Sequence, residues 1–207
     1  MKTLVIDAAT EACSVALFDG DCALIAGDCH QLGRGHAEAL VPMIAALPGK
    51  GRADRIAVAL GPGSFTGVRV GLAAARALGL AWGAEVVGYP TLGLIAAMAR
   101  QERGPVPVTV ATTGGHGEWF VQHYDAAGAA LAPLASLRPE DAAMGGAALV
   151  AGSQAEALVN RRGSGEALSI WSDARAFALL PPAALGPADQ PLYGRAPDAR
   201  LPGGAAA

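Results

Sequence analysis

The sequence predicts an α/β protein made of two similar halves, each with antiparallel strands followed by alternating helices and strands. Three observations predict this fold. Apolar runs of strand length open the chain around an Asp-Gly pair, and runs with helical spacing then alternate with short apolar runs. A weaker series in the same order begins after residue 104. With 207 residues, 52% of them hydrophobic and 16% charged, the chain is large and apolar enough to bury a core.

The first half opens with three predicted strands. Residues 3–7 form the first, and residues 13–18 and 22–26 flank the turn Asp19-Gly20. Two apolar runs joined at an Asp-Gly pair are typical of a β-hairpin. The opening is therefore an antiparallel meander.

Helices and strands alternate from His36 onward. The spacing predicts a helix over residues 36–47, with a kink or a late start at Pro42. A buried strand over 56–60 follows, then a helix over 67–82, a strand over 85–89 and a helix over 91–100. Three antiparallel strands followed by this alternation are the order of a ribonuclease-H-like domain.

The second half repeats this order more weakly. Strands are predicted over 106–111, 118–124 and 129–132, a short helix near Glu140, a strand over 148–151 and a helix over 154–159. Two such halves in tandem make the actin-like ATPase (ASKHA) architecture, with the second half degenerate. We expect an N-terminal lobe over 1–103 and a smaller C-terminal lobe over 104–207, whose tail, 196–207, is expected to fray.

Composition limits the classes of function. A net charge of −3 argues against a protein that grips nucleic acid alone. The odd number of cysteines, three, fits neither a disulfide framework nor a zinc ribbon. The opening MKTLVID does not resemble a signal peptide, and the apolar run from Val70 to Trp82 contains Arg76. We expect a cytoplasmic protein with no membrane contact.

The loop from Gly61 to Arg69, GPGSFTGVR, is the most informative segment. Ser64 or Thr66 can cap the helix that follows by accepting its free N–H groups. A glycine-rich turn at a helix N-terminus can also hold a phosphate, but no Gly-Lys-Ser/Thr follows as in a Walker A loop. A structural cap and an anion site are both open at this point.

The helix after this loop carries small side chains at steps of three and four residues, among them Gly71 and Ala75. Such a face lets another element approach closely. It either packs on the protein's own sheet or forms a seam with a partner helix.

Catalytic groups are sparse. Asp7 ends the first strand, where actin-like ATPases hold an acid beside their metal-bound nucleotide, and Thr10 follows it; a simple turn cap is the alternative for Asp7. The four histidines lack zinc-site spacing, so no metal site is predicted. Ser64 does not lie in a G-x-S-x-G elbow, which argues against a serine hydrolase.

At GPGSFTGVRVGLAAARALGLA, together with IDAATEACSVAL, HAEALVPMI and Tyr89-Pro90-Thr91-Leu92, the chain resembles the TsaB (YeaZ) family of the TsaD/Gcp-like actin-fold proteins. The resemblance runs through about the first hundred residues and returns faintly at Pro191-Leu192-Tyr193-Gly194-Arg195. It implies a non-catalytic scaffold that pairs with a TsaD-like threonylcarbamoyltransferase, and with a TsaE-like ATPase, to form N6-threonylcarbamoyladenosine in tRNA next to the anticodon. It also implies self-association as a homodimer, tRNA contact only through the complex, and no tightly bound cofactor, with ATP or ADP only at a complex interface.

Carried over by position, the resemblance places the partner interface on the helices from His36 to Leu47 and from Val68 to Leu80. The implied interface residues are His36, Leu40, Ile44, Val68, Gly71, Leu72, Ala75 and Leu78. The family signature loop comprises Gly63, Ser64, Phe65, Thr66, Gly67 and Arg69, assigned to shaping the first half. Asp7 and Thr10 are the nucleotide candidates.

Three departures from the family pattern stand out. The first loop reads Asp7-Ala8-Ala9-Thr10 in place of D-T-S-T, Thr113 to His116 replace an acid and arginines, and Gly194 stands where leucine is usual. Two other functions therefore stay open: an enzyme with its own ATPase or peptidase activity, and a self-contained homodimeric regulatory module.

Overall fold

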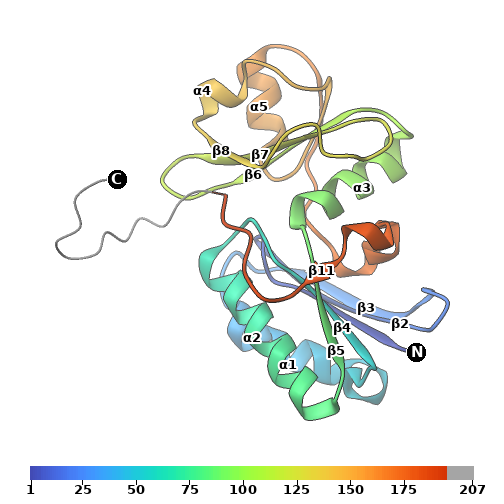
Figure 1. Cartoon of the computed structure of the whole chain (residues 1–207). Helices are drawn as coiled ribbons and strands as arrows, with labels where there is room; N and C mark the ends of the chain where they lie inside the picture. Colours follow the sequence, from blue (N-terminus) through green and yellow to red (C-terminus); the bar gives the residue numbers. More distant parts are fainter. Residues whose placement is uncertain (195–207) are drawn as a thin grey trace.

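The computed structural model describes residues 1–194, and it consists of two stacked lobes, each built on one mixed sheet (Figure 1). The strands of the first sheet are β1 (Thr3–Asp7), β2 (Ala12–Phe18), β3 (Leu24–Gln31), β4 (Arg55–Ala59), β5 (Glu85–Tyr89) and β11 (Gly186–Pro187). They lie in the order β11-β5-β4-β1-β2-β3. The meander β1–β2–β3 is antiparallel, whereas β1, β4 and β5 run parallel. The predicted opening meander is confirmed.

The second sheet repeats this arrangement with shorter strands. It contains β6 (Val108–Thr113), β7 (Trp119–Tyr124), β8 (Ala135–Leu137), β9 (Leu149–Ala151) and β10 (Glu166–Leu168), in the order β10-β9-β6-β7-β8. If β6 is matched to β1 and the others follow in sequence, the five strands of this sheet lie in the same order as β5-β4-β1-β2-β3, and only β11 at the edge of the first sheet has no counterpart. The predicted α/β, actin-like architecture of two ribonuclease-H-like halves, the second one degenerate, is confirmed.

The helices cover both sheets. They are α1 (His36–Ala46), α2 (Phe65–Trp82), α3 (Thr91–Arg103), α4 (Pro139–Ala142) and α5 (Ala155–Arg162), with the 3-10 turns η1 (Pro48–Gly51), η2 (Ala174–Leu179) and η3 (Pro182–Ala184). The helices α1 and α2 cover one face of the first sheet, and η2 packs on strands β1, β2 and β3 and on α3. Figure 1 shows α3 between the two lobes.

Two local expectations are corrected. The helix α1 runs from His36 to Ala46 through Pro42, so the helix does not start late at this residue, which lies on its exposed face. The third strand of the second half lies at 135–137, because residues 129–132 contribute only a single bridge between Tyr124 and Ala130. After residue 162 the chain forms β10, η2, η3 and β11.

The chain returns to the first lobe at its far end. Ala174 and Phe177 of η2 join the core beside Val5, Phe18 and Tyr89, and β11 pairs with β5. The lobe boundary at residues 103 and 104 therefore stays a prediction. The expected fraying of 196–207 lies outside the described residues. Within residues 1–194, no helix is long and apolar enough to span a membrane.

Candidate functional site

Asp7, at the end of β1, is fully buried inside a hydrogen-bond network. One carboxylate oxygen accepts the backbone N–H of Ala9 at 3.0 Å, and the other accepts the hydroxyls of Tyr89 at 3.0 Å and Ser172 at 2.5 Å. Tyr89 ends β5 just before the chain passes to α3, and Ser172 lies where the chain returns to the first lobe. The Asp7 carboxylate therefore binds both segments that connect the lobes, the one that leaves the first lobe after Tyr89 and the one that returns to it at Ser172.

Burial dominates the electrostatics of this network. Loss of solvent raises the pKa of the Asp7 carboxyl above its ordinary value of 3.8, against the lowering effect of the hydrogen bonds from Ser172, Ala9 and Tyr89. The pKa of the Tyr89 hydroxyl is raised well above 10.0, first by burial and then by the charge of Asp7. Tyr89 is thus a hydrogen-bond donor at neutral pH, and Asp7 is its acceptor.

Thr10, the second nucleotide candidate, is also engaged within the chain. Its backbone oxygen lies 2.9 Å from Nε2 of His36, and its hydroxyl oxygen accepts the N–H of Ala12 at 3.3 Å. His36 is the first residue of α1, so this contact fixes the start of that helix against the β1–β2 loop.

The backbone of the signature loop lies in direct contact with the backbone of the β1–β2 loop. The N–H of Ser64 donates to the carbonyl oxygen of Ala9 at 2.7 Å. A Cβ atom at Gly63 would overlap the same oxygen, and one at Gly67 would overlap the carbonyl oxygen of Ala8. Glycine is required at both positions by this contact between backbones.

Ser64 is the N-cap of α2. Its hydroxyl accepts the N–H of Gly67 at 3.2 Å. Of the two candidate caps, Ser64 and Thr66, the structure assigns Ser64. The structural reading of this loop therefore accounts for its glycines and its serine.

Arg69 connects the signature loop to the far end of the chain. Its guanidinium carbon lies 3.3 Å from the centre of the Phe65 ring and 5.4 Å from that of Tyr193, and Nη2 donates to the Tyr193 hydroxyl at 2.7 Å. Leu192 also donates its N–H to the carbonyl oxygen of Leu60 at 2.7 Å. The motif at 191–195, where the family resemblance returns, thus packs on the signature loop through Leu192 and Tyr193. Its last residue, Arg195, lies outside the described residues.

Gly194 has a physical reason for departing from the family's leucine. A Cβ atom there would overlap the ring of Phe120, which belongs to β7 of the second lobe. Two successive residues therefore contact both lobes: Tyr193 contacts Arg69 of the first lobe, and Gly194 lies against Phe120 of the second.

A cleft of about 200 Å³ lies between the two lobes. Thr10 and Ser64 line it from the first lobe, and Thr112 and Thr113 from the second; the other lining residues are Ala9, Glu11, Gly33 and Gly63. The hydroxyl of Thr113 is bonded to Ser153 and to Gln154. The cleft is thus lined by three threonines, one serine and one glutamate beside small residues, and Asp7 is not among its lining residues. Within residues 1–194, no three His, Cys, Asp or Glu side chains are grouped so as to hold a metal ion.

The implied interface residues are corrected by the structure. Seven of the eight are buried within this chain, and Leu78 is partly buried against the same core. They are His36, Leu40, Ile44, Val68, Gly71, Leu72, Ala75 and Leu78. Small side chains on α2 let that helix lie close to its own sheet: Gly71 lies near Val58 and Ile6, and a Cβ at Gly79 would overlap Val86. Helical spacing located the amphipathic faces but did not say which face was inward.

The opposite face of the two helices is exposed and apolar. Val41 is 62% exposed on α1, and Leu80 is 89% exposed on α2. Ala77 and Ala73, about one and two helical turns before Leu80, are also exposed. We call Val41, Ala73, Ala77 and Leu80 the outer helical face.

Sequence reasoning missed Tyr89, Ser172 and Tyr193 as partners of the candidate residues. Tyr89 and Tyr193 lay in quoted motifs, so a signal existed for their positions but not for their contacts. Ser172 lies 165 positions from Asp7, and no local pattern marks it.

Comparison with known proteins gives the family. The family model described as TsaD, tRNA N6-adenosine threonylcarbamoyltransferase, matches residues 30–156, more than half of the chain. The protein named tRNA threonylcarbamoyladenosine biosynthesis protein TsaB is 39% identical over 132 residues in Escherichia coli and 40% identical over 103 residues in Haemophilus influenzae. These alignments cover 60% and 46% of this chain, and 55% and 41% of those relatives.

Solved structures agree with this assignment. The structure of YeaZ from Pseudomonas aeruginosa superposes with a TM-score of 0.78 at 26% identity, covering 93% of this chain and 99% of that one. EutJ from Carboxydothermus hydrogenoformans, at 14% identity and a TM-score of 0.50 over 86% of this chain and 89% of its own, supports the actin-like fold alone. The chain therefore belongs to the family that the TsaD model describes, and within it to the TsaB (YeaZ) proteins.

Proposed function

We propose that this chain acts in the biosynthesis of threonylcarbamoyladenosine in tRNA, as a non-catalytic subunit that binds a TsaD-like threonylcarbamoyltransferase through its outer helical face and makes that enzyme competent. The names of its relatives support the pathway. The alignments span about half of those relatives, so activity and partners are inferred.

The observation that carries the scaffold role is the outer helical face. Val41 and Leu80 are large apolar side chains that are mostly exposed to solvent. Ala73 and Ala77 are also exposed, and their side chains are small. Exposed apolar side chains grouped on neighbouring helices are typical of an interface, and small residues let a partner helix approach closely.

Two features support a non-catalytic role. The carboxylate of Asp7, at the position where actin-like ATPases coordinate metal-bound nucleotide, accepts three hydrogen bonds from its own chain. The cleft beside it measures about 200 Å³ and has no lysine or arginine among its lining residues, so it offers no cationic side chain to a nucleotide phosphate. ATP or ADP, where it takes part, is expected at an interface between subunits, and a TsaE-like ATPase completes the complex.

Light scattering on a sizing column tests the pairing, with this chain alone and mixed with the TsaD-like protein of the same organism. We expect a new species at the heterodimer mass. Leu80→Arg should remove it while the chain stays folded, and Met144→Arg, an equally exposed site on the second lobe, is the matched control.

The mixture is then assayed for threonylcarbamoyladenosine formation on tRNA, with the TsaD-like protein alone as reference. Full activity of the TsaD-like protein without this chain would refute the scaffold role. A stable dimer of this chain that does not mix with the TsaD-like protein would favour the homodimeric module, since the same face fits a second copy. ATP or peptide hydrolysis by the purified chain, abolished by Asp7→Ala, would favour an enzyme.

A further inference from the structure

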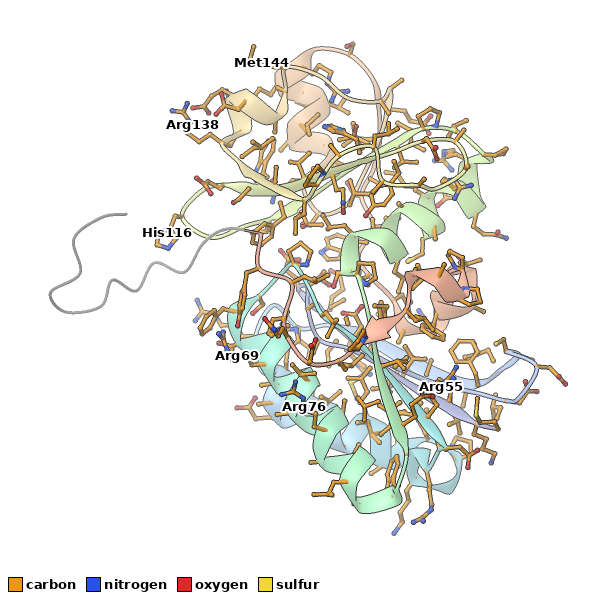
Figure 2. The ribbon with its side chains drawn as sticks, in the orientation of Figure 1. Arg55, Arg69, Arg76, His116, Arg138 and Met144 are labelled. Atoms are coloured by element: carbon orange, nitrogen blue, oxygen red, sulfur yellow. The ribbon has the colours of Figure 1, made fainter. Side chains whose placement is uncertain are left out.

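Two arginines follow one edge of α2, beside the segment of residues 186–194 that crosses back over the first lobe (Figure 2). Arg69 donates to the carbonyl oxygen of Phe65 at 3.3 Å and to the Tyr193 hydroxyl at 2.7 Å. Arg76 donates to the carbonyl oxygens of Ala188, at 2.8 and 3.2 Å, and Asp189, at 2.6 Å. We call Arg69 and Arg76 the arginine edge.

The acceptors of the arginine edge are neutral oxygens. These hydrogen bonds orient the two guanidinium groups but leave their positive charge without a carboxylate in these contacts. Other arginines of the chain differ: Arg55 lies 2.8 Å from Glu85, and Arg175 lies 2.6 Å from Asp173. Arg100 and Arg162 also donate to backbone carbonyl oxygens, but both are partly buried, whereas Arg69 and Arg76 are exposed and can reach a partner.

The spacing of the arginine edge matches a helix. The two residues are seven positions apart, which is about two helical turns, or about 10.5 Å along the axis. Arg69 and Arg76 are both exposed, and so are Ala73 and Leu80 on the adjoining outer helical face. A partner helix packed on that face would bring its own residues at the same two-turn spacing beside the arginines.

We propose that the arginine edge binds two carboxylates, seven residues apart on a helix of the protein partner, and that this pairing orients the partner helix on the outer helical face. The proposal rests on the proposed function, because it names the chemistry of the same partner. Planar guanidinium groups bind carboxylates in pairs of parallel hydrogen bonds, and the stacking of Arg69 on Phe65 fixes one of them in advance.

Affinity for the TsaD-like protein, measured by calorimetry with the full chain, tests the pairing. The double variant Arg69→Glu/Arg76→Glu should weaken Kd at least about fivefold, mainly through slower association, because both charges lie at an exposed rim. Arg52→Glu/Arg161→Glu, at two exposed positions, is the control for net charge. Tyr193→Phe is the control for the contact between Arg69 and the 186–194 segment. Wild-type Kd should also rise between about 0.05 M and about 0.5 M salt, and less so in the double variant.

The outcomes are separable. If the wild-type chain does not bind the TsaD-like protein, the proposed function fails. If it binds and the arginine-edge variant keeps wild-type Kd and salt dependence, only the arginine edge is refuted. A loss in Tyr193→Phe equal to that of the double variant would assign the effect to the 186–194 segment and overturn the proposal. Unchanged partner affinity with weaker binding of tRNA to the complex would overturn it in favour of a phosphate contact.

Discussion

Asp7 offers a sharp test, because burial and hydrogen bonding act on its pKa in opposite directions. Replacing it by Asn keeps the shape and an acceptor while removing the charge. Since burial raises the pKa of Asp7 above 3.8, the folded chain retains the proton to a higher pH than the unfolded chain does. Stability contributed by the protonated form is therefore lost as pH rises from about 3.8 through the folded pKa.

The size of the effect follows from linkage. Each unit by which the pKa is raised costs the wild-type fold about 1.4 kcal/mol relative to Asp7→Asn once the carboxyl is ionised. Removing the Ser172 hydroxyl takes away one hydrogen bond to this carboxylate. Ser172→Ala should thus cost about 2 kcal/mol, or about 4–8 °C in Tm for a chain of this size, and should raise the pKa of Asp7 further.

The assay is urea unfolding of wild type and Asp7→Asn in steps from about pH 4 to about pH 8. We expect the free energy of unfolding of wild type to fall relative to that of the Asn variant as pH rises. Asp21→Asn, at an exposed turn position, is the control for a change of charge alone. The opposite slope, with wild type gaining stability relative to Asn as pH rises, would show that the hydrogen bonds outweigh burial and would refute this reasoning.

Three further predictions concern the signature loop and the helices. Gly63→Ala should destabilise the chain by about 2 kcal/mol or more, because its Cβ overlaps a carbonyl oxygen, whereas Gly145→Ala, where a Cβ meets open space, should leave Tm within about 2 °C. Ala75→Arg should unfold the chain because it buries a charge, and the near-ultraviolet circular dichroism should be lost. Ala73→Arg, on the outer helical face, should keep the fold and abolish binding of the partner. A folded Ala75→Arg variant would contradict the placement of Ala75 in the core. Tyr193→Phe should change the free energy of unfolding by less than about 1 kcal/mol, because its bond to Arg69 is exposed, and a larger loss in urea unfolding would mean that the 186–194 segment is held mainly by this contact.

Features carried by neighbouring residues could be predicted from the sequence. The Asp19-Gly20 hairpin, the parallel strand before Gly61 and the helix capped by Ser64 depend on turn chemistry and periodicity within a few positions. The close contact of Gly63 with the carbonyl oxygen of Ala9 was not predicted, because its partner lies in a loop more than fifty residues earlier.

Long-range and two-sided features could not be predicted in the same way. Helical spacing marks a stripe of small side chains on α2 but does not say whether it faces the chain's own sheet or a partner. Ala75 was therefore assigned to the interface although it is buried in the core. The partnership of Asp7 with Ser172 and the pairing of β11 with β5 join residues far apart in sequence. No local pattern encodes which of many serines reaches a buried carboxylate.

The return of the chain to its first lobe also bears on how the protein is made. During synthesis, the strands β1 to β5 emerge early, but β11 and η2, which complete their sheet edge and one of their faces, emerge only after residues 174–187 are translated. Until then Val5, Phe18 and Tyr89 lack the covering side chains of Ala174 and Phe177. The first lobe to be translated is therefore completed only after residues 174–187 have been made, and until then the part of its sheet face that Ala174 and Phe177 cover stays open to solvent.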